Sequence, residues 1–177
     1  MRVVGGKFRS RVLLAFSGND IRPTSDKVRE SIFNIIQTRI YGATFLDLFC
    51  GTGAMGIEAL SRSAKKVHFN DRSKQSLELT KKNLKSLGVT DGVVTTNLDA
   101  LTLLSSTKEK YDIIFIDPPY ASDLGVKSLS LVKNALNDDG IVIFEDEKKF
   151  EGQIEGLKVV DTRKYGRVHL TFFAKGE

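Results

Sequence analysis

The residues best suited to chemistry are four consecutive ones, Asp117-Pro118-Pro119-Tyr120, which directly follow an apolar run at 113–116. Two successive prolines interrupt ladder pairing and hold Asp117 extended, so this corner of the chain is rigid. The Asp117 carboxylate and the Pro118 carbonyl could each accept an N–H of a planar amine, while Tyr120 stacks on its base. These four residues therefore predict a catalytic site that aligns a base amine for direct displacement at a methyl carbon. The alternative is that Pro118 and Pro119 merely end a strand.

A glycine-rich turn, Gly51-Thr52-Gly53-Ala54-Met55-Gly56, forms a second candidate site. Its glycine spacing matches G-x-G-x-x-G, and Asp71 follows Gly51 by 20 residues, so a nicotinamide-dependent oxidoreductase is one interpretation. Asp47 argues against it, because a carboxylate at the mouth of the turn repels a pyrophosphate and attracts an ammonium group. The turn therefore favours S-adenosylmethionine, which carries no phosphate.

Two further acids, Asp71 and Asp99, end the next two predicted strands. Asp71 can accept from ribose hydroxyls and Asp99 from an adenine amine, although each acid could instead only cap a helix or bind backbone N–H groups. Acids at three successive strand ends favour a ligand site, because open α/β sheets bind ligands at that edge. The predicted cofactor-binding residues are Asp47, Phe49, Gly51, Gly53, Asp71, Arg72, Asp99, Ala100, Asp117 and Thr24.

Short apolar runs alternate with longer amphipathic ones, which predicts a parallel α/β sheet. Strands are expected near 44–48, 66–70, 92–96, 112–116 and 141–145, with helices near 54–63, 73–87, 101–107 and 123–137. Two β-rich runs around residues 164–167 predict a terminal antiparallel hairpin. At the other end, runs 1–6 and 10–16 could pair as a small hairpin, followed by a helix from Thr24 or Ser25 to about Ile40.

The composition is that of an ordinary folded protein: 177 residues, 41% hydrophobic and 28% charged. We expect one domain over residues 1–177, with a basic N-terminal part at 1–40 and a catalytic core at 41–177. The absence of an apolar run long enough to cross a bilayer predicts a cytoplasmic protein without a membrane partner. One cysteine, Cys50, interpreted as a small buried residue, and two distant histidines predict no metal site.

Positive charge is concentrated at the N-terminus, where residues 1–29 account for the whole formal net charge of +5. Such a segment can attract a polyphosphate and release its counterions, which favours a nucleic-acid partner, although from charge alone a solvated basic face is an equal alternative. The predicted RNA contacts are Lys7, Arg9, Arg11, Arg22 and Arg29.

With these motifs in place, the sequence resembles the class I methyltransferases, and more narrowly the bacterial 16S ribosomal RNA guanine-N(2) methyltransferases of the RsmD family. The segments specific to that family are 2–9 and 22–34, whereas 45–60 and 117–120 are shared with other amino-methylating enzymes. Ser10, where glycine is usual, and Asp71, where glutamate is common, depart from the pattern.

The resemblance implies a Rossmann-like, seven-stranded, mostly parallel sheet in the order 3-2-1-4-5-7-6, with strand 7 antiparallel and helices on both faces. It also implies S-adenosylmethionine as cofactor and the N(2) amine of one 16S rRNA guanine as substrate, presented on an assembled or assembling small subunit to a monomeric enzyme. DNA adenine and protein glutamine methyltransferases, which use a related tetrapeptide, are alternatives that the N-terminal segment argues against. A non-catalytic RNA-binding module is a further alternative.

Overall fold

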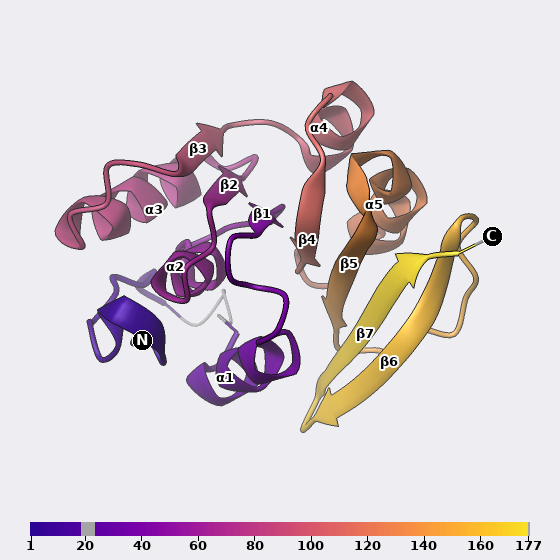
Figure 1. Cartoon of the computed structure of the whole chain (residues 1–177), viewed down its shortest axis with the longest axis horizontal. Coiled ribbons are helices and arrows are strands. Elements are labelled where there is room, and N and C mark those ends of the chain that lie inside the picture. The colour runs from indigo at the N-terminus through magenta and orange to yellow at the C-terminus, as the bar shows by residue number, and fades with distance from the viewer. Residues whose placement is uncertain (19–23, 177) are drawn as a thin grey trace.

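The computed structural model describes residues 1–18 and 24–176, so the predicted RNA contact Arg22 lies outside the described residues. The described chain contains a seven-stranded sheet in the order β3-β2-β1-β4-β5-β7-β6 (Figure 1). Strands β1 to β5 pair in parallel, and β7 is antiparallel to both β5 and β6. The resemblance therefore predicted the strand order and the antiparallel strand correctly.

The strands are β1 (Thr44–Asp47), β2 (Lys66–Asn70), β3 (Val93–Thr96), β4 (Tyr111–Ile116), β5 (Leu136–Asp146), β6 (Leu157–Tyr165) and β7 (Val168–Lys175). The helices are α1 (Asp26–Ile35), α2 (Ala54–Ser61), α3 (Lys74–Ser86), α4 (Ala100–Ser106) and α5 (Leu124–Val132), with short 3-10 turns η1 (Gly6–Phe8) and η2 (Lys133–Ala135). No helix in the described part of the chain is both long and apolar enough to span a bilayer.

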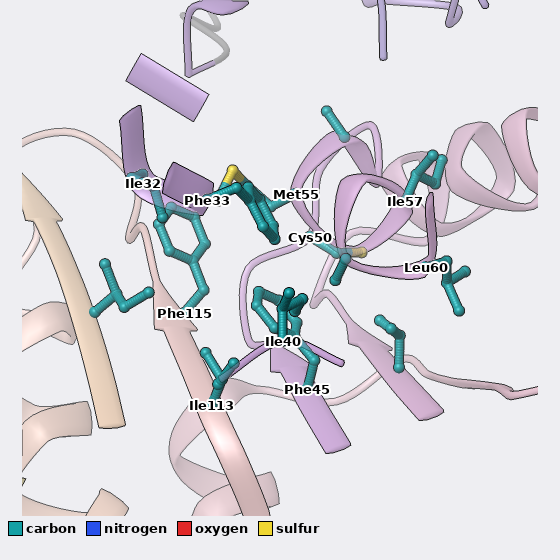
Figure 2. Close-up of a cluster of buried hydrophobic side chains, with 14 of the residues drawn as sticks. Ile32, Phe33, Ile40, Phe45, Cys50, Met55, Ile57, Leu60, Ile113 and Phe115 are labelled. Carbon is teal, nitrogen blue, oxygen red and sulfur yellow. The ribbon is translucent and has the colours of Figure 1, made fainter. Parts of the chain in front are cut away.

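The two faces of the sheet bury separate apolar layers, because successive side chains of a strand point to opposite faces. In β4, Ile113 and Phe115 pack in one layer with α1, α2 and α3, whereas Ile114 and Ile116 pack in the other with α4 and α5. Figure 2 shows side chains of α1, α2, β1 and β4 gathered in the first layer. This layering matters for the site, because the alternation continues into the residues that follow β4.

Most predicted elements are confirmed, including the terminal hairpin, but two helices are shorter than predicted. The first helix begins after Ser25, whose hydroxyl accepts the Val28 N–H at 3.2 Å, and it ends at Ile35 rather than near Ile40. The helix predicted at 123–137 ends at Val132, and β5 begins at Leu136, which pairs with Tyr111. The residues after it, Asn-Asp-Asp-Gly at 137–140, are poor helix formers, so the pairing with β4 prevails.

The predicted small N-terminal hairpin is confirmed as a short antiparallel pairing. A bridge joins Arg2 and Val12, and the N–H groups of Val3 and Leu13 donate to the carbonyls of Arg11 and Met1 at 3.0 and 2.9 Å. The N–H groups of Val4 and Gly5 donate to the Glu58 carboxylate at 2.9 and 3.4 Å instead of to a partner strand. Ser10 then takes a φ of 69°, in the left-handed region that favours glycine, which explains why a glycine suits this position.

A buried ion cluster fastens this N-terminal segment to α1 and α2. The side chains of Glu58 and Arg29 are both fully buried, and Arg29 Nε lies 3.9 Å from Glu58 Oε1. Arg62 lies 3.7 Å from the same oxygen. Arg29 also donates to the backbone carbonyls of Arg2 and Thr24, so one side chain joins three segments.

Replacing Glu58 with alanine should therefore destabilise the protein by about 3 to 5 kcal/mol, because the buried Arg29 would keep only Asp26 as a carboxylate partner and the N–H groups of Val4 and Gly5 would lose their acceptor. Urea unfolding measures this change. The matched control is Glu78→Ala, which removes an exposed pair with Lys81 and should cost less than about 0.5 kcal/mol. Equal effects of the two substitutions would contradict a stabilising role for the cluster.

Candidate active site

The parallel strands bring acidic residues to one edge of the sheet. Asp47 ends β1, Asp117 follows β4 directly, and Glu145 lies next to last in β5. The register pairs Asp47 with Phe115 and Ile116 with Phe144, so Asp117 and Glu145 follow at the same level. Three carboxylates far apart in the sequence therefore meet at the carboxyl edge of the sheet.

The glycine turn after β1 is shaped by backbone and packing constraints. Gly51 and Gly53 have φ of 52° and 83°, and a Cβ on Gly53 would lie 2.8 Å from the Thr80 methyl group. A Cβ on Gly56 would lie 2.3 Å from the Phe69 ring, so this glycine permits α2 to pack closely on β2. A Cβ on Gly51 would meet no described atom within 4 Å, which leaves its backbone open to a ligand.

Asp47 is 1% exposed, and only one of its two carboxylate oxygens is bound within the described residues. Its Oδ2 accepts the Gly56 N–H at 3.0 Å, whereas no described residue donates to Oδ1. Burial raises the pKa of Asp47 to about 7, the Gly56 hydrogen bond lowers it in part, and the negative charge of Asp71 raises it further. A cation beside Oδ1 would favour the ionised form, so the geometry suits an ammonium or sulfonium ligand.

Asp71 and Asp99 do bind backbone N–H groups, as the alternative interpretation of these acids proposed. Asp71 accepts the N–H of Gly51 at 2.9 Å and that of Ser73 at 2.8 Å, one on each oxygen. Asp99 is the N-cap of α4 and uses only Oδ1 for this purpose. Because each carboxylate oxygen has two lone pairs, both side chains retain acceptor capacity for ligand hydroxyl and amino groups.

Asn70 is a positioning residue that the sequence analysis missed. Its fully buried side-chain amide donates to the carbonyls of Leu48 and Leu98 at 3.1 and 3.0 Å. Its oxygen accepts from the Thr96 hydroxyl at 2.7 Å. One side chain thus ties together the loops after β1, β2 and β3, which carry the predicted cofactor residues.

A cavity of about 890 Å³ opens around the Asp-Pro-Pro-Tyr corner. Tyr120 is 80% exposed at this cavity, and Asp117 is half-buried within it. The wall also includes residues that the sequence analysis did not select: Ser25, Glu145, Asp146, Lys148 and Arg167. For Glu145 and Asp146 a signal was available, because they lie at the end of the predicted strand 141–145.

Burial dominates the electrostatics of this cavity. It raises the pKa of Asp117 well above its ordinary value, and the charges of Glu145, Asp47 and Asp146 raise it further. Burial also raises the pKa of Glu145 to about 7, partly offset by the Thr24 hydroxyl, which donates to Glu145 Oε2 at 3.0 Å. The site therefore concentrates negative charge that a cationic ligand would relieve.

The remaining predicted cofactor residues differ in exposure, and Thr24 is the one among them that lines the cavity. Phe49 is half-buried, Arg72 is exposed, Ala100 is buried in the first turn of α4, and Thr24 lines the cavity. Cys50 is buried beside Thr80, and burial raises the pKa of its thiol, so it is not a nucleophile.

The predicted RNA-contacting residues divide into exposed and buried groups. Lys7, Arg9 and Arg11 are exposed, although Arg11 also donates to the Ser86 carbonyl at 2.7 Å. Arg29 is a correction, because its side chain is 0% exposed within the ion cluster with Glu58. A phosphate could reach Arg29 only if that cluster opened, so its role is internal.

The strand order, the antiparallel β7 and the acidic edge beside a glycine turn define a class I methyltransferase fold. Dinucleotide-binding folds have the order 3-2-1-4-5-6, so the nicotinamide alternative is not supported. The chain belongs to the family described as Conserved hypothetical protein 95, whose model matches residues 1–174.

Named relatives agree with this assignment. A Bacillus subtilis protein provisionally named the rRNA methyltransferase YlbH is 36% identical, over 99% of both chains. The Haemophilus influenzae "Ribosomal RNA small subunit methyltransferase D" is 34% identical, over 84% of this chain and 79% of the relative. A solved Escherichia coli structure provisionally named methyltransferase yhhF superposes with a TM-score of 0.88 at 27% identity, covering 99% of this chain and 97% of the other.

The raised pKa of Asp47 predicts a pH-dependent stability difference between the wild-type protein and Asp47→Asn. The folded protein retains a proton up to about pH 7 that the unfolded chain releases near 3.8, so this residue destabilises increasingly as pH rises through that interval. Urea unfolding without cofactor should show Asp47→Asn gaining stability relative to wild type as pH rises from about 4 to about 7, by about 1.4 kcal/mol per pKa unit at most. If the difference in unfolding free energy between the two proteins is the same at all pH values, the pKa of Asp47 is not raised in the folded protein.

Proposed function

We propose that this protein transfers a methyl group from S-adenosylmethionine to the exocyclic N(2) amine of a guanine in 16S small-subunit rRNA. The observation that carries the proposal is the rigid Asp117 corner, which lies in a cavity at the same sheet edge as the acidic cofactor residues. This arrangement supports a donor and a planar amine held side by side.

The residues around the glycine turn fit the donor. The free Asp47 oxygen would accept the ammonium group of the methionine moiety, and the Gly51 backbone would approach the ligand closely. Asp71 would accept from the ribose hydroxyls and Asp99 from the adenine amine. When bound, S-adenosylmethionine would supply an electrophilic methyl group on its sulfonium.

The Asp117 corner would orient the acceptor. An exocyclic base amine is a poor nucleophile, because its lone pair is delocalised into the ring. Asp117 and the Pro118 carbonyl would each accept one N–H and turn the lone pair toward the methyl group, while Tyr120 stacks on the base. In-line displacement would break the sulfur–methyl bond as the nitrogen–methyl bond forms, and the methylated amine held by Asp117 would then lose its proton to solvent.

The family membership supports rRNA over other amine substrates. The family model spans the basic N-terminal segment as well as the catalytic core, and relatives are named small-subunit rRNA methyltransferases. We therefore favour rRNA, presented on an assembled or assembling small subunit, over DNA adenine or protein glutamine. On this proposal the protein acts in the cytoplasm as a monomer.

Replacing Asp117 with alanine should lower the methylation rate by at least about 100-fold, because the amine loses its main orienting acceptor. Cofactor affinity, measured by calorimetry, should change little. Asp91→Ala, which removes an exposed carboxylate elsewhere, is the matched control for activity. A near-normal rate for Asp117→Ala would refute this role.

The substrate can be identified by mass mapping of small-subunit rRNA from cells with and without the protein. We expect one guanine to lose its N(2) methyl group in the deleted strain and to regain it with the wild-type gene but not with Asp117→Ala. An unchanged rRNA together with loss of a methyl group on DNA or protein would overturn the proposed substrate.

Neutralising Lys7, Arg9 and Arg11 together should weaken RNA binding and reduce its salt dependence by about one unit of slope per lost phosphate contact. Binding titrations at several salt concentrations measure this slope. Neutralising Lys108, Lys127 and Lys158, which are exposed elsewhere, controls for net charge. An equal change in both variants would mean that the N-terminal cations make no specific phosphate contacts.

A further inference from the structure

Glu145 is a carboxylate in the cavity that the methyl-transfer step leaves unused. It is 8% exposed, and it lies at the level of Asp117 on the neighbouring strand. The residues before this pair, Ile116 and Phe144, face the layer of α4 and α5, so alternation turns Asp117 and Glu145 toward the α1 face. Adjacent strands lie about 4.8 Å apart, which sets the two carboxylates side by side.

The side chain of Glu145 is anchored at one oxygen only. Oε2 accepts from the Thr24 hydroxyl at 3.0 Å, whereas no described residue donates to Oε1. Thr24 is itself held in place, because Arg29 donates to its carbonyl at 3.3 Å and is fixed by Asp26 and Glu58. The buried ion cluster thus positions a carboxylate that has one free acceptor oxygen in the cavity.

The two neighbouring carboxylates, Asp117 and Glu145, match guanine but not the other two bases that carry an exocyclic amine. Guanine presents a ring N1–H donor beside its N2 amine, whereas adenine and cytosine present a ring nitrogen acceptor beside theirs. A carboxylate facing such a nitrogen brings two lone pairs together and leaves both unsatisfied, which is costly in a buried site. Asp117 alone would accept any of the three amines, so discrimination requires a second group.

We propose that Glu145 is a specificity-determining residue that accepts the ring N1–H of guanine while Asp117 orients the N2 amine. This inference rests on the proposed function and assigns the base preference to one side chain. Thr24 and Arg29 are positioning residues for it, which gives the buried Arg29 a purpose other than phosphate contact.

The test uses small-subunit rRNA that carries either guanine or 2-aminopurine at the methylated position found by mass mapping, free or reconstituted into subunits. 2-Aminopurine keeps the 2-amine but has an acceptor at N1. Wild-type enzyme should prefer guanine by at least about 100-fold, because a site built to bind an N–H rejects an analogue that lacks it. Glu145→Gln, whose amide can donate to N1, should reduce that preference by at least about 10-fold.

Three measurements make the outcome specific to base recognition. Glu145→Asp, which keeps the charge, should retain the guanine preference even if it is slower. Glu151→Gln, at an exposed position, should leave the ratio of the rates on guanine and 2-aminopurine RNA unchanged. Cofactor affinity of Glu145→Gln should match wild type. Assays at about pH 8.5 keep Glu145 ionised, since burial raises its pKa to about 7.

The possible failures are distinguishable. If wild-type enzyme transfers no methyl group to the guanine RNA, the proposed function falls, and this inference falls with it. If wild-type enzyme methylates guanine but Glu145→Gln slows both RNAs equally, Glu145 has only a structural role and this inference alone is overturned. If Glu145→Gln loses cofactor affinity but keeps the wild-type ratio of the rates on guanine and 2-aminopurine RNA, Glu145 belongs to the cofactor site. That result would also overturn this inference.

Discussion

The constraint on which the site depends is the crowding of carboxylates at one edge of a parallel sheet. Parallel pairing forces the carboxyl ends of β1, β4 and β5 to the same edge, so Asp47, Asp117 and Glu145 meet there in a largely buried environment. Burial raises all three pKa values, and the charges of Glu145 and Asp47 raise that of Asp117 further, so the folded protein holds these acids at an energetic cost. A cationic methyl donor reduces that cost, and the same negative surroundings disfavour a pyrophosphate.

The second organising feature is the way the N-terminal segment is attached to the catalytic core. Glu58 of α2 accepts backbone N–H groups from this segment, and Arg29 of α1 joins Glu58 to the carbonyl of Thr24. In Figure 1, α1 lies between the N-terminal segment and the β6–β7 hairpin. A chain of contacts through Glu58, Arg29 and Thr24 therefore joins the segment that carries the exposed cations to the wall of the cavity.

The loops that carry the predicted cofactor residues are fixed by hydrogen bonds from polar side chains. Asn70 satisfies backbone groups of the loops after β1 and β3 from its position at the end of β2. Asp71 adds a bond to Gly51, and Asp99 caps α4. Backbone N–H capping and ligand binding are compatible in these acids, because a carboxylate has more lone pairs than the backbone uses.

The sequence by itself determined the strand–helix alternation, the glycine turn, the proline corner and the acids at strand ends, because these depend on local periodicity and backbone chemistry. The strand order and the antiparallel β7 came from the family resemblance. Local pattern predicted the short N-terminal hairpin but not where its pairing ends, because Glu58, more than 50 residues away, accepts the N–H groups of Val4 and Gly5. It also misjudged Arg29, since a cation looks the same in the sequence whether it is exposed or buried in an ion cluster. Only the tertiary structure decided that Glu145 stands beside Asp117 and that Thr24 reaches it, because strand register and the docking of α1 bring together residues that share no local signal.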